Sequence, residues 1–115
     1  MRIAINGFGR IGRSVFRILD QIDDIEVVAI NDLSSKESIA YLLKYDTIMG
    51  RFDGKVDIVN NLLHTDNQEV LIISEKNPSK LPWESLKVDI VVEATGVFRS
   101  RALLEDHIQA GAEKV

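Results

Sequence analysis

The feature that most constrains the fold is a set of three glycines at positions 7, 9 and 12, which lies between a short apolar stretch and a segment with helical periodicity. In the pattern Gly7-Phe8-Gly9-Arg10-Ile11-Gly12, the first glycine permits a tight turn and the second lets a ligand approach the backbone. The third lets a helix pack closely on a strand. The pattern therefore predicts a strand, a turn and a helix. A glycine-rich turn without a ligand is an alternative that the glycines alone leave open.

The segments around this turn fit that prediction. Arg2–Asn6 has the character of a short strand. After the turn, apolar residues recur at helical spacing and predict one buried stripe, made of Ile11, Val15, Ile18, Leu19 and Ile22. Glu26–Asn31 is almost continuously apolar, which is typical of a strand buried on both faces in a parallel sheet.

Asp32 follows this second strand, twenty residues after Gly12. An acid there can accept hydrogen bonds from the hydroxyls of an adenosine ribose, although Asp32 taken alone is more often an ordinary turn residue, since Asn-Asp pairs are common after strands. The whole order of elements predicts a dinucleotide site, in which the N–H groups at the helix start bind a diphosphate and Arg10 adds positive charge. We expect no second arginine near Asp32, so a 2′-phosphate would be repelled and NAD is predicted over NADP.

The remaining elements are predicted from capping residues, alternation and turn residues. They are a helix from a Ser34/Glu37 capping box to about Lys44, a hairpin of Val56–Val59 and Leu62-Leu63 around Asn60-Asn61, strands at Val70–Ser74 and Val88–Val92, a helix from an N-cap at Ser100 to Gly111, and the start of a further strand at Glu113–Val115. Together they predict an α/β fold of the Rossmann type, with a doubly wound, mostly parallel sheet that is truncated before completion. Residues 1–115 would form one NAD-binding domain, and an uncovered edge at Val88–Val92 would favour self-association.

Composition narrows the classes of function. The 115 residues contain no cysteine, which excludes a disulfide, a thiolate nucleophile and a cysteine-based zinc site, and the net charge of −4 points away from nucleic acid. His64 and His107 belong to no catalytic motif and are expected to be surface or structural residues. No catalytic or metal-binding residue is predicted. Neither an export signal nor a membrane span is found, so a cytoplasmic protein without a membrane partner is expected.

Several further stretches match one enzyme family in the family's own order: Ile5–Arg13, Val28–Asp32, Lys44–Asp46, Gly50–Phe52, Pro82-Trp83, Val88–Glu93, Thr95–Phe98 and Ala110–Ala112. Over essentially its whole length, the chain resembles the amino-terminal part of the phosphorylating glyceraldehyde-3-phosphate dehydrogenases. It departs from them at Met49, where the family usually has histidine, and at Lys76, where the family has an arginine near the adenine.

The resemblance implies that NAD is the cofactor. It implies that backbone groups of Arg10 and Ile11 meet the pyrophosphate, that Asn6 lies alongside the cofactor, and that Asp32 holds the adenosine ribose. The predicted cofactor site comprises Asn6, Gly7, Phe8, Gly9, Arg10, Ile11, Gly12, Asn31, Asp32, Lys76, Thr95, Gly96 and Phe98.

In the family, a cysteine attacks an aldehyde sugar phosphate, a histidine acts as base, hydride passes to NAD, and phosphate releases the acyl group. That cysteine lies downstream of the matched region, so we expect these residues alone to be inactive and to belong to a longer enzyme, a homotetramer by resemblance. Erythrose-4-phosphate dehydrogenase shares the same amino-terminal pattern and is an alternative. A dinucleotide-binding module without catalysis is an alternative from another class.

Overall fold

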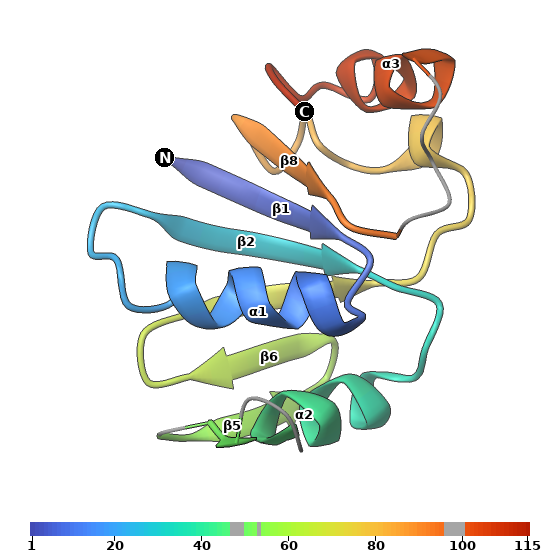
Figure 1. Ribbon diagram of the computed structural model, residues 1–115. Helices are drawn as coiled ribbons and strands as arrows, with labels where there is room; N and C mark the ends of the chain where they lie inside the picture. The colour runs from blue at the N-terminus through green and yellow to red at the C-terminus, as the bar shows by residue number, and fades with distance from the viewer. Residues whose placement is uncertain (47–49, 53, 96–100) are drawn as a thin grey trace.

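The computed structural model describes residues 1–46, 50–52, 54–95 and 101–115, and Figure 1 shows their arrangement. The elements in chain order are β1 (Arg2–Asn6), α1 (Arg10–Leu19), β2 (Glu26–Asn31), α2 (Lys36–Lys44), β3 (Tyr45–Asp46), β4 (Gly50–Arg51), β5 (Val56–Val59), β6 (Leu62–Thr65), β7 (Glu69–Ile73), the 3-10 helix η1 (Pro78–Lys80), β8 (Ile90–Glu93) and α3 (Arg101–Gln109). The predicted strands, hairpin and helices are therefore all present. The predicted N-cap Ser100 lies outside the described residues.

Six of the described strands form one sheet in the order β5-β6-β7-β2-β1-β8. The pairs β7–β2, β2–β1 and β1–β8 are parallel, whereas β6 runs antiparallel to both of its neighbours. Asn6 lies opposite Asn31 on one side and Glu93 on the other, so three strands end at the same edge of the sheet. The chain winds from β1 outward to β2 and β7, and then returns to place β8 on the other side of β1. Such a reversal of winding creates a crevice at the carboxyl ends of the strands, where open α/β sheets bind ligands.

Each face of the sheet carries its own apolar core. One core joins Ile5 and Ile30 to Phe16 of α1 and Ile39 of α2. The other joins Ala4 and Ala29 to the segment after η1 and to the residues that follow α3, with the members Val28, Leu81, Trp83, Val88, Val91, Ala110 and Ala112. Figure 1 shows α1 in front of the sheet, alongside β2, and α3 on the β8 side of the molecule. Two covered faces agree with the predicted doubly wound class.

The predicted buried stripe of α1 was wrong. Ile11 and Ile18 are 67% and 63% exposed, whereas the buried residues of the helix are Gly12 and Phe16. A β-carbon at Gly12 would overlap the carbonyl oxygen of Gly7, so helix and turn touch through their backbones. This contact fixes the rotation of α1 about its axis, turns Phe16 toward the sheet and leaves the stripe of Ile11 and Ile18 outside. Val15 and Leu19 pack at the margin of the core, and Ile22 lies beyond the helix and is exposed.

The predicted cap of the second helix was displaced by one residue. The N-cap of α2 is Ser35, whose hydroxyl accepts a hydrogen bond from the Ser38 N–H at 3.1 Å. Ser34 cannot serve because its own N–H donates to the Asp32 carboxylate at 3.0 Å and keeps it in the preceding turn. The end of the helix at Lys44 is confirmed.

The last part of the chain covers the outer side of β8. Lys114 forms a parallel bridge with Ile90, as expected for the start of a strand at Glu113–Val115. Gly111 adopts a φ of +116° just after α3, which confirms the predicted left-handed end of that helix. None of the helices in the described part of the chain combines the length and the apolar character that a bilayer crossing demands.

Candidate functional site

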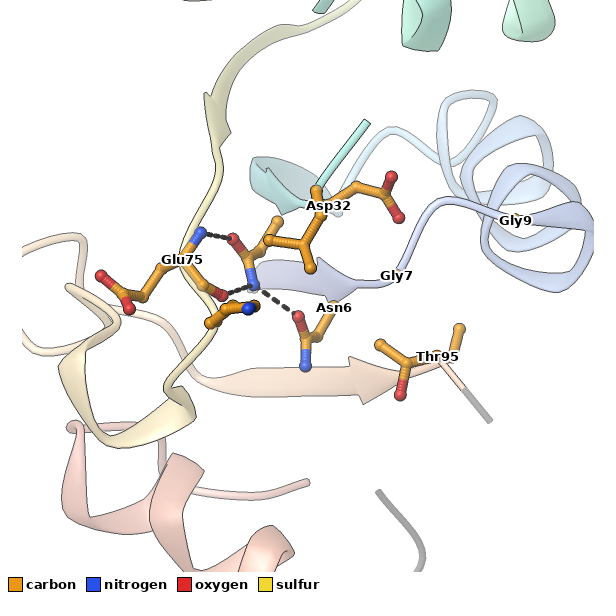
Figure 2. Close-up of a pocket in the computed structure, with 10 residues that line it drawn as sticks. Asn6, Gly7, Gly9, Asp32, Glu75 and Thr95 are labelled. Carbon is orange, nitrogen blue, oxygen red and sulfur yellow. Dashed lines mark hydrogen bonds between the residues drawn. The ribbon is translucent and has the colours of Figure 1, made fainter. Parts of the chain in front are cut away.

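A pocket of about 540 Å³ opens where β1, β2 and β8 end, and Figure 2 shows its walls. Seven of its lining residues were predicted: Asn6, Gly7, Gly9, Asn31, Asp32, Lys76 and Thr95. Three others, Leu33, Glu75 and Ala94, were not predicted. They lie within two residues of the ends of β2, β7 and β8, and the topology of the sheet brings them together. Gly96 and Phe98 lie outside the described residues.

The glycine turn forms the floor of this pocket. Gly7 has a φ of +96°, and a β-carbon on it would lie 2.7 Å from the Thr95 backbone nitrogen, so the turn passes tightly under the end of β8. Gly9 differs from the other two glycines. It lines the pocket with an ordinary φ of −77°, and a β-carbon on it would meet nothing within 4 Å. The absence of a side chain at Gly9 therefore keeps space open in the pocket rather than relieving a clash within the fold.

The amino-terminal end of α1 points its backbone donors toward that space. Gly9 is the N-cap, it has no side chain that could cap the helix, and no acidic residue occupies the first turn. The first N–H groups of a helix have no intrahelical acceptors, and they carry the positive end of the helix dipole. The N–H groups of Arg10 and Ile11 can therefore bind an anion such as a diphosphate.

The predicted residues Phe8, Arg10, Ile11 and Gly12 flank the pocket rather than line it. The Phe8 side chain is buried in the core, where its ring meets that of Phe16 edge to face with centroids 5.8 Å apart. The Phe8 side chain is therefore not available to a ligand in the pocket.

Asp32 lines the same pocket, and its carboxylate lies against the turn that precedes this helix. Its carboxylate accepts hydrogen bonds from the N–H groups of Phe8 at 2.8 Å and Ser34 at 3.0 Å. Burial by itself raises the pKa of this carboxyl. The hydrogen bonds from Phe8 and Ser34, together with the positive charge of Arg13, outweigh burial, so the net pKa of Asp32 lies below its ordinary value. Asp32 is thus a fixed anion with oxygen lone pairs available for ribose hydroxyls.

The charge of Arg13 corrects one expectation. No second arginine was expected near Asp32, but the Arg13 guanidinium lowers the pKa of that carboxyl and donates to the Phe8 carbonyl oxygen at 3.2 Å. The helical spacing could have predicted this position of Arg13, because residues 9, 10 and 13 lie at the same end of α1, close to Asp32.

Two asparagines join the strand ends across the pocket. Asn31 donates through Nδ2 to Oδ1 of Asn6 at 2.7 Å and to the Glu75 carbonyl oxygen at 3.0 Å. The Glu75 N–H donates back to Oδ1 of Asn31 at 2.8 Å (Figure 2). Both side chains are buried, and each amide orientation is fixed by partners of known polarity.

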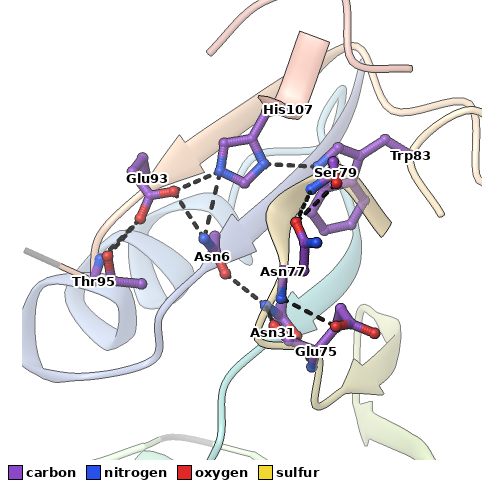
Figure 3. A network of polar contacts seen from close by, with 9 residues as sticks. All are labelled: Asn6, Asn31, Glu75, Asn77, Ser79, Trp83, Glu93, Thr95 and His107. Carbon is purple, nitrogen blue, oxygen red and sulfur yellow. Dashed lines mark hydrogen bonds and ion pairs between the residues drawn. The ribbon is translucent and has the colours of Figure 1, made fainter. Parts of the chain in front are cut away.

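A buried polar network, shown in Figure 3, lies behind Asn6 and was missed by sequence analysis. Glu93 accepts from Nδ2 of Asn6 at 2.8 Å and from the Thr95 hydroxyl at 2.7 Å, and Nε2 of His107 lies 2.6 Å from its Oε2. The Trp83 indole Nε1 lies 3.0 Å from Nδ1 of His107. We call Asn6, Thr95, Glu93, His107 and Trp83 the Glu93 network. His107, expected to be a surface or structural residue, is fully buried and is therefore not a surface residue.

The Glu93 carboxyl stays ionised inside this network. Burial raises the pKa of the carboxyl, but hydrogen bonds from His107, Asn6 and Thr95 outweigh burial and lower its net pKa. No sequence pattern marked this cluster, because its members are separated by up to 101 residues and meet only at the strand ends.

Comparisons with known proteins identify a family and several relatives of this chain. The family described as "Glyceraldehyde 3-phosphate dehydrogenase, NAD binding domain" matches residues 1–101. A glyceraldehyde-3-phosphate dehydrogenase of Thermotoga maritima is 55% identical over 99% of this chain and 35% of its own length. Proteins with the same name from Streptomyces coelicolor and Mycoplasma pneumoniae are 49% and 51% identical over 100% of the chain and 34% of their own lengths. The chain thus spans about a third of the length of these relatives.

Proposed function

The chain belongs to the family of glyceraldehyde-3-phosphate dehydrogenase NAD-binding domains, and from this premise we propose that residues 1–115 are the NAD-binding part of a longer oxidoreductase. One observation carries the proposal. The open space beside Gly9, at the donor end of α1, and the ionised Asp32 belong to a single pocket. A diphosphate and a ribose need this pair of groups, in this order along the chain.

The residues present fit NAD. The backbone N–H groups of Arg10 and Ile11 would hold the diphosphate, and the Asp32 carboxylate would accept from the adenosine ribose. Of the residues that line the pocket, Leu33 and Lys76 would lie on the adenosine side, and Asn6 and Thr95 would lie on the other side. By resemblance, Gly96 and Phe98 would complete the cleft. Bound NAD supplies a nicotinamide ring that accepts a hydride.

We expect NAD to bind more tightly than NADP. The 2′-phosphate of NADP would approach the Asp32 carboxylate, and Arg13 offsets only part of that repulsion. Calorimetric titration of the intact protein with both dinucleotides tests the site. Failure to bind either one would refute the proposed function. Asp32→Ala should weaken NAD binding, because the ribose hydroxyls lose their acceptor.

For the whole protein we propose the oxidation of an aldehyde sugar phosphate with NAD and inorganic phosphate, in a cytoplasmic homotetramer. The names of the relatives support the dehydrogenase activity, and one relative, from Trypanosoma brucei brucei, is described as cytosolic. The use of inorganic phosphate and the homotetramer rest on the family resemblance. The nucleophile and base would come from the two-thirds of the relatives' length that this chain does not span, since the chain has no cysteine.

Erythrose-4-phosphate dehydrogenase remains the alternative substrate class. Initial rates of the intact protein with glyceraldehyde 3-phosphate and with erythrose 4-phosphate, each with and without inorganic phosphate, separate the two. A higher kcat/KM for glyceraldehyde 3-phosphate that depends on phosphate supports the proposal. NAD binding without turnover of either substrate would instead favour a non-catalytic dinucleotide-binding module.

A further inference from the structure

The inference concerns the half of the pocket that lies away from Asp32, and it rests on the proposed binding of NAD. With the adenosine ribose at the end of β2 and the diphosphate at the start of α1, the nicotinamide half must extend over the ends of β1 and β8. Asn6 and Thr95 line that side, and both donate to one buried carboxylate, Glu93. The state of Glu93 therefore bears on the nicotinamide half.

The proton positions in the Glu93 network follow from its donors. An indole N–H can only donate, so Nδ1 of His107 must be the acceptor of the Trp83 hydrogen bond. The remaining ring nitrogen, Nε2, then carries the proton and donates to Oε2 of Glu93 at 2.6 Å. An imidazolium would place an N–H of His107 against the N–H of Trp83. His107 is therefore the neutral Nε2–H tautomer.

With His107 neutral, the network carries one net negative charge. Glu93 receives hydrogen bonds from the Asn6 amide, the His107 ring and the Thr95 hydroxyl and N–H, all of which are neutral groups. Among the described residues, the ion pairs of this chain give Glu93 no lysine or arginine partner. Its side chain is 8% exposed, so water screens this charge poorly.

Asn6 is fixed at both ends between this charge and the pocket. Its Nδ2 donates to Glu93, and its Oδ1 accepts from Asn31, which is itself held by the backbone of Glu75. Nε2 of His107 lies 3.4 Å from Nδ2 of Asn6, but it carries a proton and cannot accept from it. Asn6 can therefore keep only one orientation while Glu93 is a carboxylate.

We propose that Glu93 is a positioning residue that holds Asn6 and Thr95 under the nicotinamide half, and that its uncompensated charge makes the pocket prefer oxidised over reduced dinucleotide. The oxidised nicotinamide ring is a cation and the reduced ring is neutral, so a buried anion below the pocket stabilises only the oxidised form. His107 and Trp83 sustain the preference, because the indole donor prevents the histidine from becoming a compensating cation.

The test compares NAD⁺, NADH and ADP binding by calorimetry in the intact wild-type protein and in Glu93→Gln. Glutamine removes the negative charge. Its side-chain amide group also replaces one acceptor oxygen with a donor, which would then face either the donors of His107 and Asn6 or the donors of Thr95. We expect the ratio of NAD⁺ to NADH affinity to fall about tenfold or more, the effect of one unit charge at about 10 Å with an effective dielectric near 20. ADP contains no nicotinamide half, so its affinity should not change.

Glu69→Gln is the matched control, since Glu69 is an exposed carboxylate at the opposite end of the sheet, at the start of β7. It should leave all three affinities unchanged. An unchanged NAD⁺ to NADH ratio in Glu93→Gln, or an equal fall in ADP affinity, overturns the inference while the proposed function stands. A wild-type protein that binds neither NAD⁺ nor ADP overturns both.

A second measurement needs no variant and decides the matter if Glu93→Gln does not fold. Nitrogen-15 NMR of histidine-labelled wild-type protein at neutral pH should find Nε2 of His107 protonated and Nδ1 bare. An imidazolium, or a proton on Nδ1, would overturn the inference because the network would then lose its net charge or its order of donors.

Discussion

Replacing Gly9 and Gly12 separately by alanine should show that Gly12 is needed for the stability of the fold and Gly9 for the binding of NAD. A β-carbon at Gly12 overlaps the Gly7 carbonyl oxygen, which belongs to the backbone and cannot rotate away. Gly12→Ala should therefore destabilise the fold by about 3 kcal/mol, near the upper end of the usual range for overpacking. Gly9 has a φ that alanine adopts without strain and open space for a methyl group. Gly9→Ala should change the stability of the fold by less than about 1 kcal/mol, because alanine restricts the unfolded chain but is a poorer N-cap for α1 than glycine.

Gly9→Ala should nevertheless weaken the binding of NAD. The methyl group would occupy the space that a diphosphate needs in order to reach the N–H groups of Arg10 and Ile11. A hydrogen bond to a charged group contributes about 1.5–3 kcal/mol, so losing two of them predicts a fall in NAD affinity of at least about a hundredfold. Urea denaturation of both variants and calorimetry with NAD provide the two readouts. Unchanged NAD affinity in Gly9→Ala, or a Gly9→Ala protein less stable than Gly12→Ala, would refute the assignment of the turn.

Three further outcomes follow from the polar contacts. Asp32→Ala should narrow the preference for NAD over NADP, because the carboxylate whose repulsion Arg13 only partly offsets is gone; calorimetry that finds the same ratio as wild type would contradict this. Burial raises the pKa of Asp20 above its ordinary 3.8, so its ionised form disfavours folding at neutral pH and this penalty disappears below that ordinary pKa. Asp20→Asn should thus raise the midpoint of thermal unfolding at pH 7 but not at acidic pH, and an equal gain at both would argue against it. Ser35→Ala should lower the free energy of unfolding by about 1 kcal/mol because it removes the cap of α2, whereas Ser34→Ala should lower it less. Equal losses of the two variants in urea denaturation would contradict the assignment of Ser35 as the cap.

The sequence was sufficient to predict the structure wherever only residues close together in the chain determine it. The apolar runs of β1 and β2, the glycine turn between them and the left-handed Gly111 each depend on residues within a few positions of one another. The same local rules failed at Ile11 and Ile18, whose spacing describes a true helical stripe that faces outward. Periodicity defines a stripe but not its direction, and in α1 the direction is decided by the contact between Gly12 and Gly7.

The same difference between local and long-range contacts separates the two halves of the pocket. The half around Asp32 could be predicted, because the turn, the helix start and the acid follow one another within a single βαβ unit. The half around Glu93 could not, because Asn6, Glu93 and His107 lie on three elements whose adjacency depends on the return of the chain to the far side of β1. A buried histidine and a buried glutamate are individually unfavourable in a core, and neither shows in the sequence which partner satisfies it.

The direction of the hydrogen bonds in the Glu93 network indicates what this second half of the pocket does. Every hydrogen bond in it runs toward the carboxylate, beginning with an indole that can only donate, so reversing any one of them requires reversing its neighbours. A network built only to fill the core could use an uncharged acceptor and avoid the cost of burying an anion. The charge is retained directly behind two residues that line the pocket, and this location favours a role toward the ligand over a role in stability alone.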